Sequence, residues 1–468
     1  MSWIKKYLYL FPVLFYLPAL GNFFSSDDWF HLRITQIDSL QQFINFFSFT
    51  NNPQSASFYR PLSTQVYFFI FQKIFGLTAL PYYLFGLILF SYILYLIRKL
   101  SKIYLPSTVD YLPSIIYGLS VSNFTRVYFI SAFQELFLVV FSLLTIINFK
   151  ERPKLSLLFF ALALMSKETA IILPVLILLL NYKYIKNNFQ SLRPAIYGAT
   201  ILSVVYLNYR LLYFGLAQGV SYVWDFSPVK ALNTFMWYSL WSLGAPELLV
   251  DYIGSGLRPI PRFFTDYQSW WSVIIFPLVL LVISLACLFL SRFKKLNSQF
   301  WYFTLFFTIS LLPFLFLPSH KFALELGLPL VGFSVALSII FSNISNILNF
   351  CILVLFIFYN LSMNYLTYTR HYSVSRGQIS QKVYQYFSQN YPTSPDSGYF
   401  EFINDTKDNG LLWGQSKQIS QSLSRSDFFK VFYQKPDYKV YYEDTNEQRP
   451  SSNGLEAIKI STKQFLNP

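Results

Sequence analysis

The sequence has few of the residues from which most metal and nucleophile sites are built. Histidine occurs three times, too few for a multi-histidine metal site, and cysteine occurs twice, at Cys287 and Cys351 inside apolar segments. A His/Cys/Asp cluster with zinc spacing, a glycine-rich phosphate loop and a Gly-x-Ser-x-Gly elbow are all missing. The residues imply no cofactor; a divalent metal is compatible with the acidic residues but is not required.

Charged residues are also scarce. They form 12% of the 468 residues, whereas 54% are hydrophobic and 21% aromatic. A soluble domain cannot bury that much apolar surface. Repeated apolar segments of about 16–22 residues match the roughly 20 helical residues that cross the hydrocarbon core. The composition predicts a polytopic α-helical membrane protein embedded in the lipid bilayer.

The net charge of +14 could suggest a nucleic-acid partner, but its distribution excludes that interpretation. The cations cluster in short loops between apolar segments, which the positive-inside rule places in the cytoplasm. These clusters are Lys5/Lys6, Arg98/Lys99/Lys102, Lys150/Arg152/Lys154, Lys183/Lys186/Arg193 and Arg292/Lys294/Lys295. We therefore expect a multi-pass protein of the plasma membrane with a cytoplasmic amino terminus.

This assignment gives about eleven crossings. They are 7–24, 80–97, 111–123, 131–148, 155–165, 169–182, 194–214, 271–290, 299–317, 322–341 and 346–362. Residues 1–362 form the predicted transmembrane domain, with 25–79 as its first external loop. The tail 363–468 contains a helical pattern near 375–390 and the strand-like runs "GYFEFIND" and "YKVYYED". We expect a small α+β domain on the outer face, which either helps to bind an acceptor or stabilises the fold.

Ionisable groups gather at the predicted outer ends of the helices. Such groups are expensive at membrane depth and mark functional sites by default, although each could instead snorkel to the interface or pair structurally. They are Asp27, Asp28 and His31 in "SSDDWFHL", Arg60, Arg126, Glu135, Lys167, Glu168, His320 and Lys321. Carboxylates can supply a general base, and cations can hold a phosphate leaving group. The mixture favours transfer between a lipid-linked phosphate and an acceptor.

Three stretches in this order resemble a known family: "SSDDWFHL", "YRPLSTQVYFFIFQKIFG" and "ALALMSKETAIILPVLILLL". They are similar to polyprenyl-phosphate-dependent glycosyltransferases with the GT-C fold, in particular to the protein O-mannosyltransferase branch and its bacterial relatives. "GAPELLVDY" is similar to a segment of the tetratricopeptide-bearing O-mannosyltransferases. The likeness covers roughly residues 1–350.

The resemblance implies an inverting transferase that moves a sugar from a polyprenyl-phosphate donor to a hydroxyl of a glycan, lipid or protein acceptor. It makes Asp27 or Asp28 the catalytic base, and favours Asp27 because the first acid of the pair takes that role in the mannosyltransferase branch. It also gives Lys167 and Arg60 contacts to the donor phosphate. Arg126 is a further candidate phosphate ligand, with Glu168, Glu135, His31, His320 and Lys321 in supporting roles.

The sequence also departs from the family. The family's Arg-Tyr pair before a Leu-Pro segment is replaced in "SHKFALELGLPLVGF", and no tetratricopeptide repeats follow segment 346–362.

Two other functions remain open at this stage. A transporter or flippase of lipid-linked saccharides would also place polar groups in the membrane, although usually near the midplane between internal repeats. A sensor with an outer binding domain would explain the tail but not the acidic pair. Lys167 could likewise serve only as a structural partner of Glu135 or Glu168.

Overall fold

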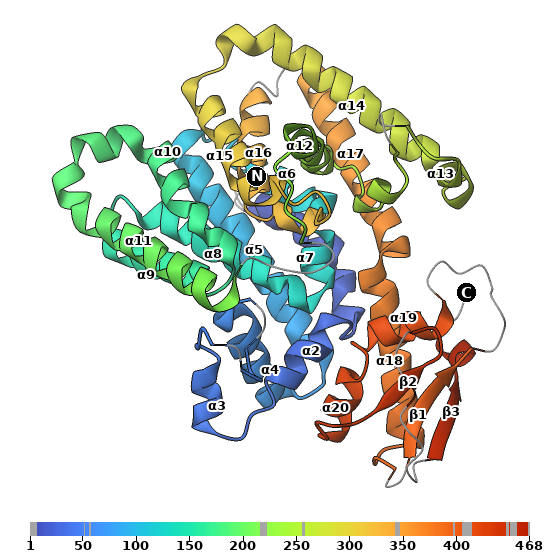
Figure 1. Cartoon of the computed structure of the whole chain (residues 1–468). Coiled ribbons are helices and arrows are strands. Elements are labelled where there is room, and N and C mark those ends of the chain that lie inside the picture. Colours follow the sequence, from blue (N-terminus) through green and yellow to red (C-terminus); the bar gives the residue numbers. More distant parts are fainter. Residues whose placement is uncertain are drawn as a thin grey trace.

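In the computed structural model, a bundle of apolar helices carries a small α+β domain at one end (Figure 1). The structure describes residues 7–50, 52–55, 58–215, 222–254, 258–341, 347–395, 398–404, 414–445, 449 and 456–466. The short helices before residue 130 include a 3-10 helix at Leu8–Gly21, α2 (Asp27–Ile34), α3 (Leu40–Asn45), α4 (Tyr67–Phe75), α6 (Leu112–Leu119) and α7 (Phe124–Tyr128). The short helices after residue 130 include α9 (Pro153–Leu164), α12 (Pro228–Ser242), α13 (Pro261–Asp266) and α16 (Pro329–Ile340).

Within the described residues, seven helical segments are long and apolar enough to cross a membrane. They are Ala79–Tyr104 (α5), Ile130–Asn148 (containing α8, Phe133–Asn148), Glu168–Asn187 (containing α10, Leu173–Asn187), Phe189–Phe214 (containing α11, Phe189–Tyr209), Trp271–Arg292 (α14), Ser298–Leu315 (α15) and Ile347–Asn390. The other four predicted crossings correspond to Leu8–Gly21, α6, α9 and α16, which are shorter. The structure therefore confirms a mostly helical, membrane-type architecture but not eleven crossings.

The outward faces of the long helices are apolar. On α14, Val279, Leu280 and Ile283 have exposed side chains, and Ile201 and Val204 on α11 are exposed as well. A water-soluble bundle would bury such residues and leave polar ones outside. This pattern fits helices whose outer faces contact lipid chains.

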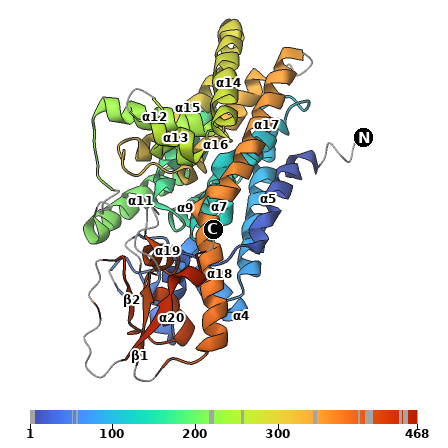
Figure 2. The same ribbon diagram turned by 90° about the vertical axis from the view of Figure 1, so that its right-hand side faces the viewer.

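The carboxyl-terminal part continues from the bundle through two successive helices that are separated by a single extended residue, His371. Helix α17 (Ile347–Arg370) extends beyond the predicted domain boundary at residue 362, and α18 (Tyr372–Asn390) follows after one residue. Figure 2 shows the two helices as one rod that runs from the bundle to the sheet. The bundle and the tail therefore share a helical element.

The tail is the predicted small α+β domain. Three parallel strands in the order β2-β1-β3 are formed by Gly398–Ile403 (β1), Val440–Tyr442 (β2) and Glu456–Ser461 (β3). Helices α18, α19 (Gln415–Ser422) and α20 (Asp427–Tyr433) pack against them. The sequence predicts α18, β1 and β2; β3 was not expected. In Figure 1, α2 of the bundle lies beside this domain.

Candidate active site

A cavity of about 440 Å³ opens among segments that are far apart in the sequence. Its walls combine aromatic rings with acidic, basic and hydroxyl side chains. The lining residues are Asp27, Phe30, His31, Phe58, Arg60, Thr64, Phe129, Ser131, Ala132, Gln134, Lys167, Tyr222, His320, Phe322, Leu324, Glu325 and Tyr372. Of the ten candidate site residues from the sequence, Asp27, His31, Arg60, Lys167 and His320 line this cavity.

The two adjacent aspartates occupy different environments. Asp28 is fully buried and accepts hydrogen bonds from the backbone N–H groups of Ser25 (2.9 Å) and Ser131 (2.7 Å) and from the Ser131 hydroxyl (2.6 Å). Asp27, the first residue of α2, has a side chain that is accessible from the cavity, although the protein around the cavity separates it from bulk water. Its carboxylate accepts no hydrogen bond within the part of the chain that the structure describes. Asp28 therefore connects α2 to the 130–132 segment, whereas Asp27 is available to a ligand.

Both carboxyl groups have raised pKa values. Loss of solvation raises the pKa of Asp27, and the nearby charge of Arg376 opposes that shift. Burial raises the pKa of Asp28 to about 7, against the hydrogen bonds from Ser131 and Ser25. A carboxylate that is poorly solvated and lacks donors is a stronger base than a solvated one, which suits Asp27 to proton abstraction.

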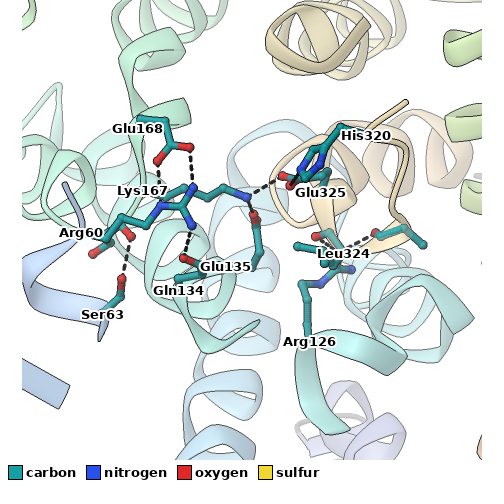
Figure 3. Close-up of polar contacts among 12 residues, drawn as sticks. Arg60, Ser63, Arg126, Gln134, Glu135, Lys167, Glu168, His320, Leu324 and Glu325 are labelled. Carbon is teal, nitrogen blue, oxygen red and sulfur yellow. Dashed lines mark hydrogen bonds and ion pairs between the residues drawn. The ribbon is translucent and has the colours of Figure 1, made fainter. Parts of the chain in front are cut away.

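Arg60 is held in place by two side chains (Figure 3). Its guanidinium donates to both carboxylate oxygens of Glu168, at 2.7 and 2.5 Å, and to Oε1 of Gln134 at 2.5 Å. It also lies 4.4 Å from the centre of the Phe58 ring. Such a two-point pair fixes the plane of the guanidinium. Because five N–H groups are available and three are used, Arg60 retains donors for a ligand.

Lys167 lies between two acids. Its ammonium donates to Glu325 at 2.5 Å and also to Glu135, and all three side chains are almost completely buried. Figure 3 shows the Lys167 side chain reaching between these two carboxylates. The Lys167/Glu135 pair is the structural alternative that the sequence left open. Two cations, Arg60 and Lys167, thus face three carboxylates, and a bound phosphate would have to compete with them.

His320 and Glu325 come from one loop that the bundle holds from two sides. Arg126, fully buried, donates to the carbonyl oxygens of Ala323 (3.2 Å) and Leu324 (2.8 Å). Glu247, from "GAPELLVDY", accepts the N–H of Ala323 at 2.9 Å, and burial raises the pKa of its carboxyl to about 7. These contacts position the loop rather than a ligand.

Five of the ten candidate residues are not on the cavity wall: Asp28, Arg126, Glu135, Glu168 and Lys321. Arg126, expected to bind phosphate, uses its guanidinium to hold backbone carbonyls, and Lys321 donates to Asn233 at 3.2 Å instead. His320 does line the cavity: its ring stacks on Tyr222 with centroids 4.1 Å apart, and its Nε2 is 3.6 Å from Glu325.

His31 adds a neutral polar group to the wall. Burial and the charge of Arg60 lower the pKa of its imidazole to about 3, so the ring is uncharged at neutral pH. Its Nδ1 is buried and has no hydrogen-bond partner among the described residues. His31 therefore adds a polar ring without charge to the cavity wall.

The cavity wall also contains polar and aromatic residues that were not among the candidates from the sequence, among them Ser131, Gln134, Tyr222 and Tyr372. Gln134 precedes Glu135 and could have been found from its position beside a candidate acid. Tyr222 and Tyr372 carried no signal among the 36 tyrosines of the chain.

The donor set does not favour a metal. Among the described residues, no group of three or more His, Cys, Asp or Glu side chains is arranged to hold an ion. The prediction that no metal is required stays a prediction.

Comparison of the chain with protein-family models and with curated proteins finds no match.

Proposed function

We propose that this protein is an integral membrane glycosyltransferase that moves a sugar from a polyprenyl-phosphate donor to an acceptor hydroxyl, with inversion at the anomeric carbon. The observation that carries the proposal is the Asp27 carboxylate. It lies at the start of α2, lacks a hydrogen-bond donor among the described residues, and shares a cavity with Arg60, Lys167 and His320. A base and phosphate-binding groups on one wall are what this transfer requires.

The chemistry would proceed in one displacement. Asp27 takes the proton of the acceptor hydroxyl as that oxygen forms a bond with the anomeric carbon. The bond between this carbon and the phosphate oxygen breaks, and the phosphate leaves on its polyprenyl chain with the electron pair. Arg60 keeps two N–H donors for the departing phosphate, and His320 lines the same cavity, whereas the Lys167 ammonium is shared by Glu135 and Glu325.

The apolar surroundings support a lipid-linked donor. Exposed apolar faces on the bundle would let a polyprenyl chain lie beside the helices while its head group enters the cavity. The resemblance of "SSDDWFHL" and "SKET" to GT-C transferases points to the same donor class. The sugar and the acceptor are not specified by these residues.

The direct test uses the purified full chain in liposomes with a polyprenyl-phosphate donor carrying radiolabelled mannose or glucose. We expect labelled sugar to move to a hydroxyl acceptor or to water, with release of polyprenyl phosphate. Movement of intact donor between leaflets without cleavage would instead identify a flippase and overturn the proposal.

The proposed orientation places the carboxyl-terminal domain and the cavity outside the cytoplasm, on the strength of the basic loop clusters. Ser416 is fully buried and hydrogen-bonded to Asp444, so it is unsuitable as a labelling position. Asp437 is exposed. We expect Asp437→Cys, in a variant lacking Cys287 and Cys351, to react with an impermeant maleimide on intact cells. Reaction only in inverted vesicles would reverse the proposed orientation.

A further inference from the structure

Ser26, in the turn just before Asp27, has a backbone conformation that is unfavourable for a residue with a side chain. Ser26 has φ 49° and ψ −124°, and the N–H of Asp28 donates to the carbonyl of Ser25 at 3.0 Å. These values match the first central position of a type II′ turn, where glycine is preferred because a Cβ is strained. Strained backbone persists only when the surrounding structure holds it.

The contacts that hold this turn come from the carboxyl-terminal part of the chain. The N–H of Ser26 donates to the carbonyl of Ser422, at the end of α19, at 2.8 Å. Arg376 of α18 donates to the Ser26 hydroxyl at 3.3 Å and, through its other terminal nitrogen, to Gln421 of α19 at 2.8 Å. One guanidinium therefore joins the turn to the same helix end that accepts its backbone N–H.

The rest of α2 is held by the same domain. Arg33 pairs with Asp427 at 2.7 Å, and the Trp29 indole N–H donates to the Ser380 hydroxyl at 2.9 Å. The Trp29 ring also meets Phe428 edge to face, with centroids 4.8 Å apart. The domain thus contacts α2 along its length. Domain movement would be transmitted to the first residue of the helix, Asp27.

From these contacts we propose that the carboxyl-terminal domain is a clamp that keeps Asp27 pointing into the cavity, and that Arg376 is its positioning residue. This assignment rests on the proposed function for the role of Asp27, but the geometry of the clamp does not. Positioning Asp27 is a role of the domain distinct from acceptor binding and from stabilisation of the fold, the two roles that the sequence suggested.

A double-mutant cycle tests the clamp. We expect Arg376→Gln to lower kcat about 100-fold, the cost of a misplacement of roughly 1 Å, with little change in the KM for the donor. Arg376→Lys, which keeps a cation and a donor, should recover part of that loss. In a Ser26→Gly background the same Arg376→Gln change should cost much less, because glycine adopts φ > 0 without support. Lys382→Gln, in the same helix but bonded to the Phe465 carbonyl, is the matched control and should keep wild-type kcat.

A second measurement does not depend on sugar transfer. Asp27→Cys is made in a variant with Cys287→Ala and Cys351→Ala, since both native cysteines are exposed. The rate of alkylation by iodoacetamide is followed against pH, and its high-pH plateau reports access to the thiol apart from its pKa. We expect Arg376→Gln to lower this plateau several-fold and Lys382→Gln to leave it unchanged.

The outcomes separate the clamp from the proposed function. Equal losses from Arg376→Gln in both backgrounds, together with an unchanged alkylation plateau, would overturn the clamp while leaving a transferase. If the wild-type chain transfers no sugar, the proposed function fails, and a lowered plateau still supports the clamp.

Discussion

Asp27→Asn should reduce sugar transfer by about 10²–10⁴-fold, the range that a positioned general base contributes. Asparagine has nearly the same shape but cannot take a proton from the acceptor hydroxyl. Because the Asp27 carboxylate has no hydrogen bond among the described residues and faces the cavity, the substitution removes no internal contact. The measurement is kcat with labelled donor, alongside thermal unfolding of the purified protein, which should be unchanged. A variant with wild-type turnover would exclude Asp27 as the base.

Asp28→Asn is the matched control at the neighbouring position. Asp28 now accepts hydrogen bonds from Ser25 and Ser131, and the NH2 group of an asparagine would point toward one of these donors. Leaving such a buried donor unpaired costs about 1–3 kcal/mol. We therefore expect lowered stability, with the remaining folded protein still active. If Asp28→Asn abolished turnover at unchanged stability, the roles of the two aspartates would be exchanged.

The pH profile gives a further check on the same residue. A base must be ionised to act, so kcat/KM falls as the pH drops through the pKa of Asp27. Burial raises that pKa, which moves the acid limb above the pH expected for a solvated aspartate. In Asp27→Asn the limb should disappear from the residual activity. An acid limb that survives the substitution would belong to another group.

Sequence patterns predicted the parts of the fold that depend on local composition. Long apolar runs located α5, α14 and α15, and the alternation in "GYFEFIND" located β1. Crossings were harder to count, because α9 and α16 are apolar but only 12 residues long. Length alone cannot decide whether such helices span a membrane.

The candidate site depended on contacts that no local pattern contains. The sequence identified an acidic pair, and only the family resemblance favoured Asp27 within it, because one of the two residues that donate to Asp28 is Ser131, 103 residues away. Likewise "SKET" identified Lys167, whereas its partner Glu325 lies 158 residues further along the chain. The support of the turn at Ser26 by Ser422 and Arg376 was invisible for the same reason.

Because of the groups that surround Lys167, we expect its replacement to lower the stability of the protein more than the other single substitutions do. Lys167 is 2% exposed, and its partners Glu135 and Glu325 are 1% and 5% exposed. Lys167→Met retains the apolar stem but leaves two buried carboxylates without their cation. Removing one partner of a buried ion pair costs about 3–5 kcal/mol. We expect a marked fall in the temperature at which the detergent-solubilised protein unfolds, whereas Lys73→Met, at an exposed position on α4, should change little.

Neutralising the partners separates this role from a phosphate contact. Lys167→Met combined with Glu135→Gln and Glu325→Gln removes the unpaired charges and should regain much of the lost stability, because a buried ion network replaced by neutral groups of similar volume is often tolerated. Donor affinity is measured on the same variants. If Lys167 mainly binds phosphate, Lys167→Met would weaken donor binding at unchanged stability, and the neutral partners would rescue nothing. The burial of all three groups favours the opposite result: loss of stability in the single variant, and recovery in the triple one.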